Sequence, residues 1–187
     1  MTPVVVGRAV AALHRQQNPD EIMMRAWLGL GANLQQPLKQ LQLALDKLKQ
    51  STAISLVEVS SYYRTPPWGD QQQDDFINAV AQIETNLAPL PLLHVLQSIE
   101  NDMGRSRDGR RWGPRVIDID LLLFGGHRCQ GAELEIPHPR MHERAFVLMP
   151  LSELDFNLEI PGRGAVGSLL AQLNCDGIQK LDNSFLE

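Results

Sequence analysis

A short apolar segment that carries two aspartates constrains this 187-residue chain more than any other feature. Over Val116–Phe124, a β-strand would point Asp118 and Asp120 to one face. Its opposite, apolar face would carry Val116 or Ile117 with Ile119, Leu121 and Leu123. Fixed positive charge beside such a pair indicates a polyanion that is held together with a divalent cation. Five arginines supply that charge just ahead of the strand: Arg105, Arg107, Arg110, Arg111 and Arg115.

The spacing of the two aspartates suits a magnesium site. Mg²⁺ prefers hard oxygen ligands and keeps waters or phosphate oxygens in its other positions, so two carboxylates at i and i+2 of a strand can ligate it together. Taken alone, the pair fits solvent-facing acids on an edge strand just as well. The arginines favour the metal, because Mg²⁺ with a triphosphate supplies a cation for the aspartates and an anion for the guanidinium groups.

The arginine-rich loop, residues 105–115, has a second interpretation as an RNA-binding segment with Trp112 as a stacking residue. Against it stand the adjacent acid pair, a net charge of −5 and the lack of another basic, aromatic-rich stretch. We therefore expect no nucleic-acid partner. A glycine-containing loop with five guanidinium groups instead predicts a lid that closes over phosphates and excludes water.

Length and composition indicate one globular domain, which we expect to act as a cytoplasmic monomer. No run of about 18 uncharged apolar residues is present to cross a bilayer. Cys129 and Cys175 lack Cys-x-x-Cys spacing, which fits unpaired thiols in a reducing compartment. We expect residues 1–24 to be a disordered extension or to precede an internal start, and residues 25–187 to form the domain.

The periodicity of residues 26–124 predicts the order β, α, β, β, α, β. Short or alternating apolar runs predict strands, and apolar residues at intervals of three or four predict helices that begin at a proline. This order matches a ferredoxin-like βαββαβ core, so the expected class is α+β with a C-terminal appendage of short helices and a hairpin near Pro161. The expected strands are Ala26–Leu30, Ile54–Tyr63, Phe76–Glu84 and Val116–Phe124, and the expected helices are Pro37–Gln50 and Leu90–Met103.

Two local patterns add expectations about turns. Gly29 and Gly31 form a G-x-G without the later glycine of a dinucleotide-binding fingerprint, so they predict a tight strand-to-helix turn. Asn33 is expected near the cap of the helix that follows. Farther along, Pro150 predicts a break in the helical stretch Met141–Leu154.

Three side chains stay ambiguous on spacing alone. His138 lies between two prolines, whose rigid backbone could aim its imidazole at phosphate or simply hold it on the surface. Phe76 and Phe146 fit core aromatics. The loop Arg64–Asp75, with two prolines and a glycine, is long enough to present backbone to a ligand.

Three stretches of the sequence resemble a known family, 6-hydroxymethyl-7,8-dihydropterin pyrophosphokinase of folate biosynthesis. The similarity runs from about Ala26 to Leu154, and its R-W-G-P-R-x-x-D-x-D segment is far more specific than a short motif. The stretches are Tyr63-Arg64-Thr65-Pro66-Pro67, Asp75-Phe76-Ile77-Asn78-Ala79 and Arg111-Trp112-Gly113-Pro114-Arg115-Val116-Ile117-Asp118-Ile119-Asp120.

The resemblance implies ATP-dependent transfer of an intact pyrophosphoryl group to the hydroxymethyl oxygen of a reduced pterin, with release of AMP. It implies that Asp118 and Asp120 hold two Mg²⁺ ions. For the phosphates it implies Arg105, Arg107, Arg115, Arg144 and His138, and for the closing loop Arg111 and Trp112. On the nucleotide side it implies Gln97, Glu100, Leu121 and Leu134. On the pterin side it implies stacking by Phe76 and Phe146, an amide contact from Asn78 and backbone contacts from Thr65, Pro66, Pro67 and Trp68.

The sequence departs from the family pattern at several positions. Phe76 and Pro139 stand where a tyrosine is common, and Trp68 stands where a leucine is common. Glu133 and Glu135 replace basic or hydroxyl residues, so nucleotide contacts at these two positions are not carried over. Two other functions stay open: an ordinary kinase or nucleotide hydrolase with the same two-metal site, and a noncatalytic RNA-binding module.

Overall fold

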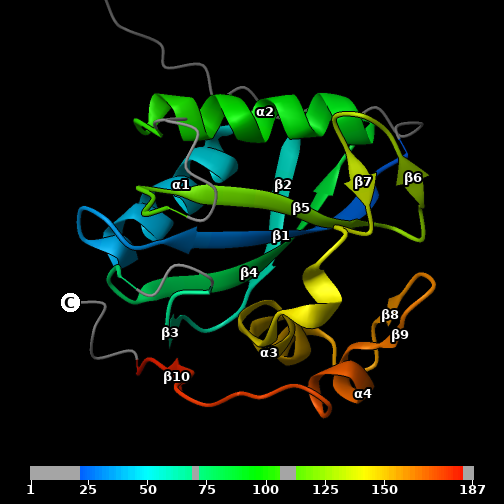
Figure 1. The fold of residues 1–187 in the computed structure, drawn as a ribbon. Helices are drawn as coiled ribbons and strands as arrows, with labels where there is room; N and C mark the ends of the chain where they lie inside the picture. Colours follow the sequence, from blue (N-terminus) through cyan, green and yellow to red (C-terminus); the bar gives the residue numbers. More distant parts are fainter. Residues whose placement is uncertain (1–21, 69–71, 106–112, 183–187) are drawn as a thin grey trace, which may run out of the picture.

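The computed structural model describes residues 22–68, 72–105 and 113–182, and an antiparallel sheet lies at its centre (Figure 1). The strand order is β10-β3-β4-β1-β5, and β2 also pairs with β4. The strands of this sheet are β1 (Met24–Ala32), β2 (Ile54–Val59), β3 (Tyr63–Thr65), β4 (Phe76–Thr85), β5 (Asp118–Phe124) and β10 (Gln179–Lys180). The helices are α1 (Pro37–Gln50), α2 (Pro89–Asp102), α3 (Ala145–Leu154) and α4 (Val166–Leu170). Shorter elements are β6 (Cys129–Gln130), β7 (Glu135–Ile136), β8 (Glu159–Ile160), β9 (Gly164–Ala165) and the 3₁₀ turn η1 (Met141–Glu143).

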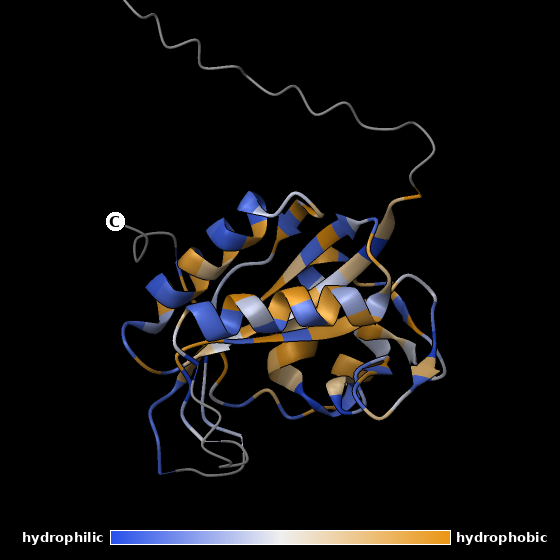
Figure 2. Cartoon of the chain, turned by 90° about the horizontal axis from the view of Figure 1, so that it is seen from above, coloured by the Kyte–Doolittle hydropathy of each residue, from blue (hydrophilic) through white to orange (hydrophobic). Residues whose placement is uncertain are grey.

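Helices cover both faces of the sheet, and each face has its own apolar core. α1 and α2 pack on one face, where Leu41 and Leu96 meet Leu28 of β1. α3 packs on the other face, where Leu148 meets Trp27, the neighbour of Leu28, and α4 packs against α3. Successive residues of a strand point to opposite faces, so β1 contributes to both cores. In Figure 2, hydrophilic and hydrophobic residues alternate along the helices, as expected for helices with one buried side.

The predicted single strand Ile54–Tyr63 is divided in the structure into β2 and β3, which both pair with β4. Ser60 lies at the break. Its N–H donates to the carbonyl of Val80 at 2.9 Å, and its hydroxyl accepts from the N–H of Val80, also at 2.9 Å. The Val80 N–H thus donates to a side-chain oxygen instead of a backbone carbonyl of the neighbouring strand. The strand is interrupted at this point, yet the Val80 amide stays hydrogen-bonded. β2 and β3 thus both pair with β4 across the loop Arg64–Asp75.

The break predicted at Pro150 is wrong. α3 runs continuously over Ala145–Leu154 with this proline inside it. A proline removes one helical hydrogen bond and costs about 3 kcal/mol in an isolated helix. Here Pro150 is itself buried between Leu148 and Leu151, and burial of this apolar side stabilises the helix. The predicted hairpin near Pro161 is confirmed as the β8–β9 pair.

No helix among the described residues is both long and apolar enough to span a membrane.

Candidate active site

Two glycines of β1 form the floor of a pocket on the face of the sheet that carries α3. Gly31 lies opposite Asn78 of β4 on one side and Asp118 of β5 on the other, and Gly29 lies opposite Asp120. The prediction of a strand-to-helix turn at these glycines is wrong, because both belong to the strand itself. Glycines at i and i+2 leave one face of a strand bare, and that space becomes the pocket.

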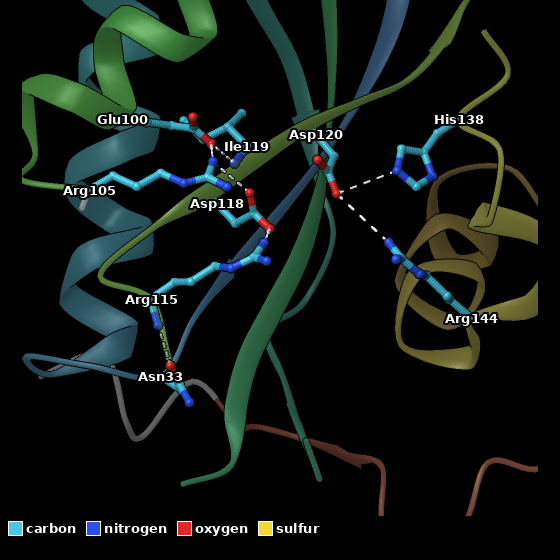
Figure 3. A network of polar contacts seen from close by, with 9 residues as sticks. All are labelled: Asn33, Glu100, Arg105, Arg115, Asp118, Ile119, Asp120, His138 and Arg144. Atoms are coloured by element: carbon cyan, nitrogen blue, oxygen red, sulfur yellow. Dashed lines mark hydrogen bonds and ion pairs between the residues drawn. The ribbon is translucent and has the colours of Figure 1, made fainter. Parts of the chain in front are cut away.

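Asp118 and Asp120 project from β5 toward this pocket, as the sequence predicted (Figure 3). Asp118 is already paired with two arginines. The Arg105 guanidinium lies 2.7 Å from its Oδ1, and the Arg115 guanidinium contacts its Oδ2. Two ends of the arginine-rich loop therefore meet at one carboxylate.

Asp120 is less closely paired. The imidazole of His138 and the guanidinium of Arg144 both lie 3.9 Å from its Oδ2, beyond hydrogen-bond distance. Burial at the crowded pocket floor, reinforced by the charge of Asp118, raises the pKa of Asp120 to about 7. About 40% of the side-chain surface is nevertheless open, and it faces the pocket. The carboxylate is thus open to a ligand, and no described side chain lies within hydrogen-bond distance of it.

Glu100 of α2 lies beneath the acid pair with a side chain only 2% exposed. Its Oε1 accepts a hydrogen bond from the Ile119 N–H at 2.7 Å and also contacts Arg105. Burial raises the pKa of Glu100, and its bonds to Ile119 and Arg105 oppose that rise. Glu100 therefore joins α2 to β5 and to the arginine that reaches Asp118.

Asn33 joins two loops around the pocket. Its Oδ1 accepts from the Arg115 N–H at 2.7 Å, and its own N–H donates to the Arg115 carbonyl at 3.0 Å. Its amide nitrogen donates to the side chain of Gln73 at 3.0 Å and to the carbonyl of Asp74 at 3.1 Å. Asn33 lies three residues ahead of the N-cap position of α1, which Gln36 occupies without a side-chain capping bond. Asn33 instead fastens the end of the arginine-rich loop to the loop ahead of β4.

The opposite wall of the pocket is aromatic. The Arg144 guanidinium lies 4.9 Å from the ring centre of Trp68 and 5.7 Å from that of Phe146, and the two rings are 6.4 Å apart. Such cation–π contacts hold a guanidinium without neutralising its charge. Beside them, the Asn78 amide donates to the Thr65 hydroxyl at 2.7 Å, which fixes its orientation.

His138 stands between the acid pair and a second cleft on the far side. Its Nδ1 accepts from the Arg140 N–H at 3.3 Å, so the proton of the neutral ring lies on Nε2, which faces Asp120. Burial, followed by the charge of Arg144, lowers the pKa of His138 to about 4. The ring is therefore neutral at pH 7 and can donate a hydrogen bond to an anion.

The main pocket holds about 730 Å³ of space, part of it open to solvent. Gln97, Glu100, Arg105, Leu121, Leu134, Pro67 and His138 lie outside its lining. Arg107, Arg111 and Trp112 lie outside the described residues. The predicted residues that the structure brings together around the pocket are Thr65, Pro66, Trp68, Phe76, Asn78, Arg115, Asp118, Asp120, Arg144 and Phe146.

The donor set of the acid pair fits a divalent cation. Two carboxylates lie on one face of β5, and their mutual repulsion contributes to the raised pKa of Asp120, which a cation would relieve. Across the described parts of the chain, no third His, Cys, Asp or Glu completes a metal cluster with them. Two hard oxygen donors with open positions are typical of Mg²⁺ sites that are completed by substrate phosphates.

Comparison with known proteins agrees with this geometry. Residues 27–156 match the family of 7,8-dihydro-6-hydroxymethylpterin-pyrophosphokinase (HPPK). The chain belongs to this family. The resemblance that the sequence motifs indicated is thereby confirmed. The matched residues contain most of β1, all of β2 to β5 and α3, and all of the residues that line the pocket.

Three relatives share the name 2-amino-4-hydroxy-6-hydroxymethyldihydropteridine pyrophosphokinase. The one from Haemophilus influenzae is 46% identical over 80% of this chain and 93% of its own length. The one from Methylorubrum extorquens is 46% identical over 86% of this chain and 100% of its own length. The one from Pseudomonas aeruginosa is 44% identical over 86% of this chain and 98% of its own length.

Solved structures of Plasmodium falciparum HPPK-DHPS have a similar fold. The wild-type protein with pteroate gives a TM-score of 0.65 at 14% identity over 81% of this chain. The wild-type protein with pterin and p-hydroxybenzoate gives 0.65 at 15% identity over 83% of this chain. This chain spans 42% of the length of each. At that identity the likeness concerns the fold alone.

Proposed function

We propose that this chain transfers the pyrophosphoryl group of ATP to the hydroxymethyl oxygen of 6-hydroxymethyl-7,8-dihydropterin. In this reaction the pterin oxygen bonds to the β-phosphorus, the bond from that phosphorus to the α–β bridging oxygen breaks, and AMP leaves. One observation carries the proposal: the carboxylates Asp118 and Asp120 with their arginines, and the aromatic wall with the Asn78 amide, line the same pocket. The relatives' names agree with it.

Asp118 and Asp120 are the residues proposed to hold Mg²⁺, and we propose two ions. When bound, the metal supplies positive charge that offsets charge developing on the phosphates. The protein's own part is to fix the two carboxylates on a hydrogen-bonded strand. Glu100 supports this role from below, because it accepts from the Ile119 N–H between them.

Arginines and one neutral imidazole are proposed to bind the phosphates. Arg105 and Arg115 already lie at the acid pair, and Arg144 approaches it from α3. His138 would contribute a hydrogen bond rather than a charge, given its lowered pKa. Arg107, Arg111 and Trp112 are proposed for the closing loop on the family resemblance. Gln97, Leu121 and Leu134 are proposed for the nucleotide side on the same ground.

The pterin is proposed to bind at the other end of the floor. Phe76 and Phe146 would stack on the ring, and the Asn78 amide, held by Thr65, would pair with its polar edge. Pro66, Pro67 and Trp68 would contribute backbone contacts. This arrangement holds the hydroxyl near the phosphates, and such positioning together with fixed charge supplies most of the catalysis in phosphoryl transfer.

The decisive experiment follows the nucleotide product. The purified chain is incubated with ATP, Mg²⁺ and the hydroxymethyl dihydropterin, and the products are separated by chromatography. We expect AMP and a pterin pyrophosphate in equal amounts. Formation of ADP would indicate an ordinary kinase, phosphate release without the pterin would indicate a hydrolase, and no turnover would leave a binding module.

We also infer that the core is ferredoxin-like and that residues 125–182 form a C-terminal appendage to it. The order β3-β4-β1-β5, with α1 and α2 on one face, supports this topology. We propose a single pyrophosphokinase domain over residues 25–187, a monomer without a nucleic-acid partner. The cytoplasmic location stays a prediction from the sequence, and the extension 1–24 falls almost wholly outside the described residues.

A further inference from the structure

Glu153, near the end of α3, binds the chain at the break between β2 and β3. Its Oε2 accepts from the Ser61 N–H at 2.7 Å, directly after the break at Ser60. The hydroxyl of Tyr63 donates to the same carboxylate, and Lys180 forms an ion pair with its Oε1. One side chain thus binds the interrupted strand and the C-terminal strand together.

The last strand, β10, binds the same segment through its backbone. Gln179 and Lys180 pair with Arg64 and Tyr63 of β3, and the Leu181 N–H donates to the Tyr62 carbonyl at 2.8 Å. Figure 1 shows β10 beside β3 at the end of the chain. A few residues earlier, Gly177 has a φ of +77° and packs so closely that a β-carbon there would lie 3.3 Å from the ring of Pro66.

The segment held in this way supplies one side of the pocket. β3 has only three residues, too few for its own pairing with β4 to fix it firmly. Its last residue, Thr65, orients the Asn78 amide, and Pro66 and Trp68 line the pocket beyond it. What holds β3 therefore also sets the position of these groups.

We propose that Glu153 and residues 177–181, here called the C-terminal clasp, position the pterin-binding side of the pocket. Glu153 is a positioning residue in this proposal, which rests on the proposed function. Within the clasp, β10 lies on the outer side of β3, and Glu153 reaches the same segment from α3. Both contact β3 or the residues just before it and not β5, so the clasp bears on the proposed pterin end and not on the phosphate end. Its strand β10 lies beyond residues 27–156, the part that matches the family.

Leu181 packs against the apolar core beneath α1 and α2, whereas the side-chain contacts of Glu153 and Lys180 are polar and lie outside both cores. The Lys180 side chain is 58% exposed and that of Glu153 is 24% exposed. Burial opposes the charge on Glu153, yet the hydrogen bonds from Lys180, Ser61 and Tyr63 hold its pKa below the usual value. Loss of the clasp should therefore loosen β3 and the loop after it while the rest of the sheet stays folded.

The test separates the two substrates. For Glu153→Ala we expect the KM for the pterin to rise on the order of tenfold, with the KM for ATP and kcat within about twofold of the wild type. Lys180→Met, which keeps the Ser61 and Tyr63 bonds, should give a smaller rise of the same kind. Glu159→Gln, an exposed carboxylate on β8, serves as the matched control and should change none of the three constants.

Hydrogen exchange gives a readout that does not depend on turnover. Amides of residues 61–65 and of Trp68 should exchange faster in Glu153→Ala than in the wild type, while those of β1 keep their protection. An equal rise in the KM for the pterin and the KM for ATP would overturn the proposed role of the clasp. An unchanged KM for the pterin together with unchanged amide exchange would overturn it as well. If Glu153→Ala does not fold, the Lys180→Met constants decide in the same way. A wild-type chain without turnover would instead contradict the proposed function.

Discussion

At the scale of single residues, two aspartates of one strand have different surroundings. Asp118 is paired with Arg105 and Arg115, whereas Asp120 has no partner within hydrogen-bond distance among the described side chains. Asp118 would be free to hold a metal only after Arg105 and Arg115 turn toward a bound phosphate, whereas Asp120 is open before any ligand binds. The proposed site uses both carboxylates, because the cation and the phosphates would bind together.

Replacement of either carboxylate tests this assignment. We expect Asp118→Asn and Asp120→Asn each to lower kcat on the order of 10³-fold, because the lost ligand acts on charge that develops in the transition state. Circular dichroism should show an unchanged fold. Asp46→Asn, an exposed surface carboxylate on α1, is the control and should keep wild-type turnover. Near wild-type turnover in either site variant would remove the metal assignment.

The neutral state of His138 gives a prediction about pH. Its pKa of about 4 in the folded chain lies below the ordinary 6.5, so the unfolded chain takes up the proton first as the pH falls. The stability contributed by the neutral ring is complete above pH 6.5 and is lost as the pH falls from there to about 4. Proton NMR of the ligand-free protein should show this imidazole titrating below pH 5; a midpoint near 6.5 would contradict the buried, arginine-flanked geometry.

The site residues differ in how well the sequence revealed them. Asp118 and Asp120 could be predicted because the alternation of a strand is local information. Asn33 could not, since its partners Arg115 and Gln73 lie 82 and 40 residues away and no periodicity marks them. Glu100 was predicted for the site, but its burial against the Ile119 amide depends on how α2 packs on β5.

At the scale of elements, β1 is a strand whose glycines keep the pocket floor clear. A β-carbon at Gly31 would lie 2.8 Å from Oδ1 of Asn78, so Gly31→Ala should displace the amide that we propose to orient the pterin. We expect the KM for the pterin to rise on the order of tenfold with little loss of stability.

Steady-state kinetics and thermal unfolding measure the two effects. Gly126→Ala is the matched control, because a β-carbon there meets nothing within 4 Å. An unchanged pterin KM in Gly31→Ala would show that the floor tolerates a methyl group.

Element boundaries were predictable where one residue type fixes them. α1 begins at Pro37 and ends at Gln50, as expected from its proline and its leucine spacing. The division of the second strand was not predictable, because it depends on the Ser60 hydroxyl replacing a backbone acceptor. The prediction of a break at Pro150 was wrong because burial of α3 outweighs the tendency of proline to end a helix.

At the scale of the whole molecule, the surface gives a prediction about assembly. Among the exposed large apolar residues of the described chain, Leu43 lies on α1, Val57 on β2 and Leu90 on α2, and the others lie outside the helices and strands. No shared element gathers them into one interface, so we expect a monomer. Light scattering coupled to size exclusion should give a mass of about 20.9 kDa. A mass of about twice that value would contradict the prediction.

Asp118, Gly31 and Asn78 lie opposite one another on three neighbouring strands, and this row fixes the distance between the carboxylate and the amide. Neighbouring strands in a sheet lie about 4.8 Å apart, so the row places the carboxylate and the amide on backbones about 10 Å apart. Hydrogen-bonded ladders do not stretch, and closure of a loop cannot change this spacing. If the pterin and ATP bind as proposed, this fixed spacing favours one length of substrate side chain, and we expect an acceptor with one more carbon before its hydroxyl to be a poorer substrate.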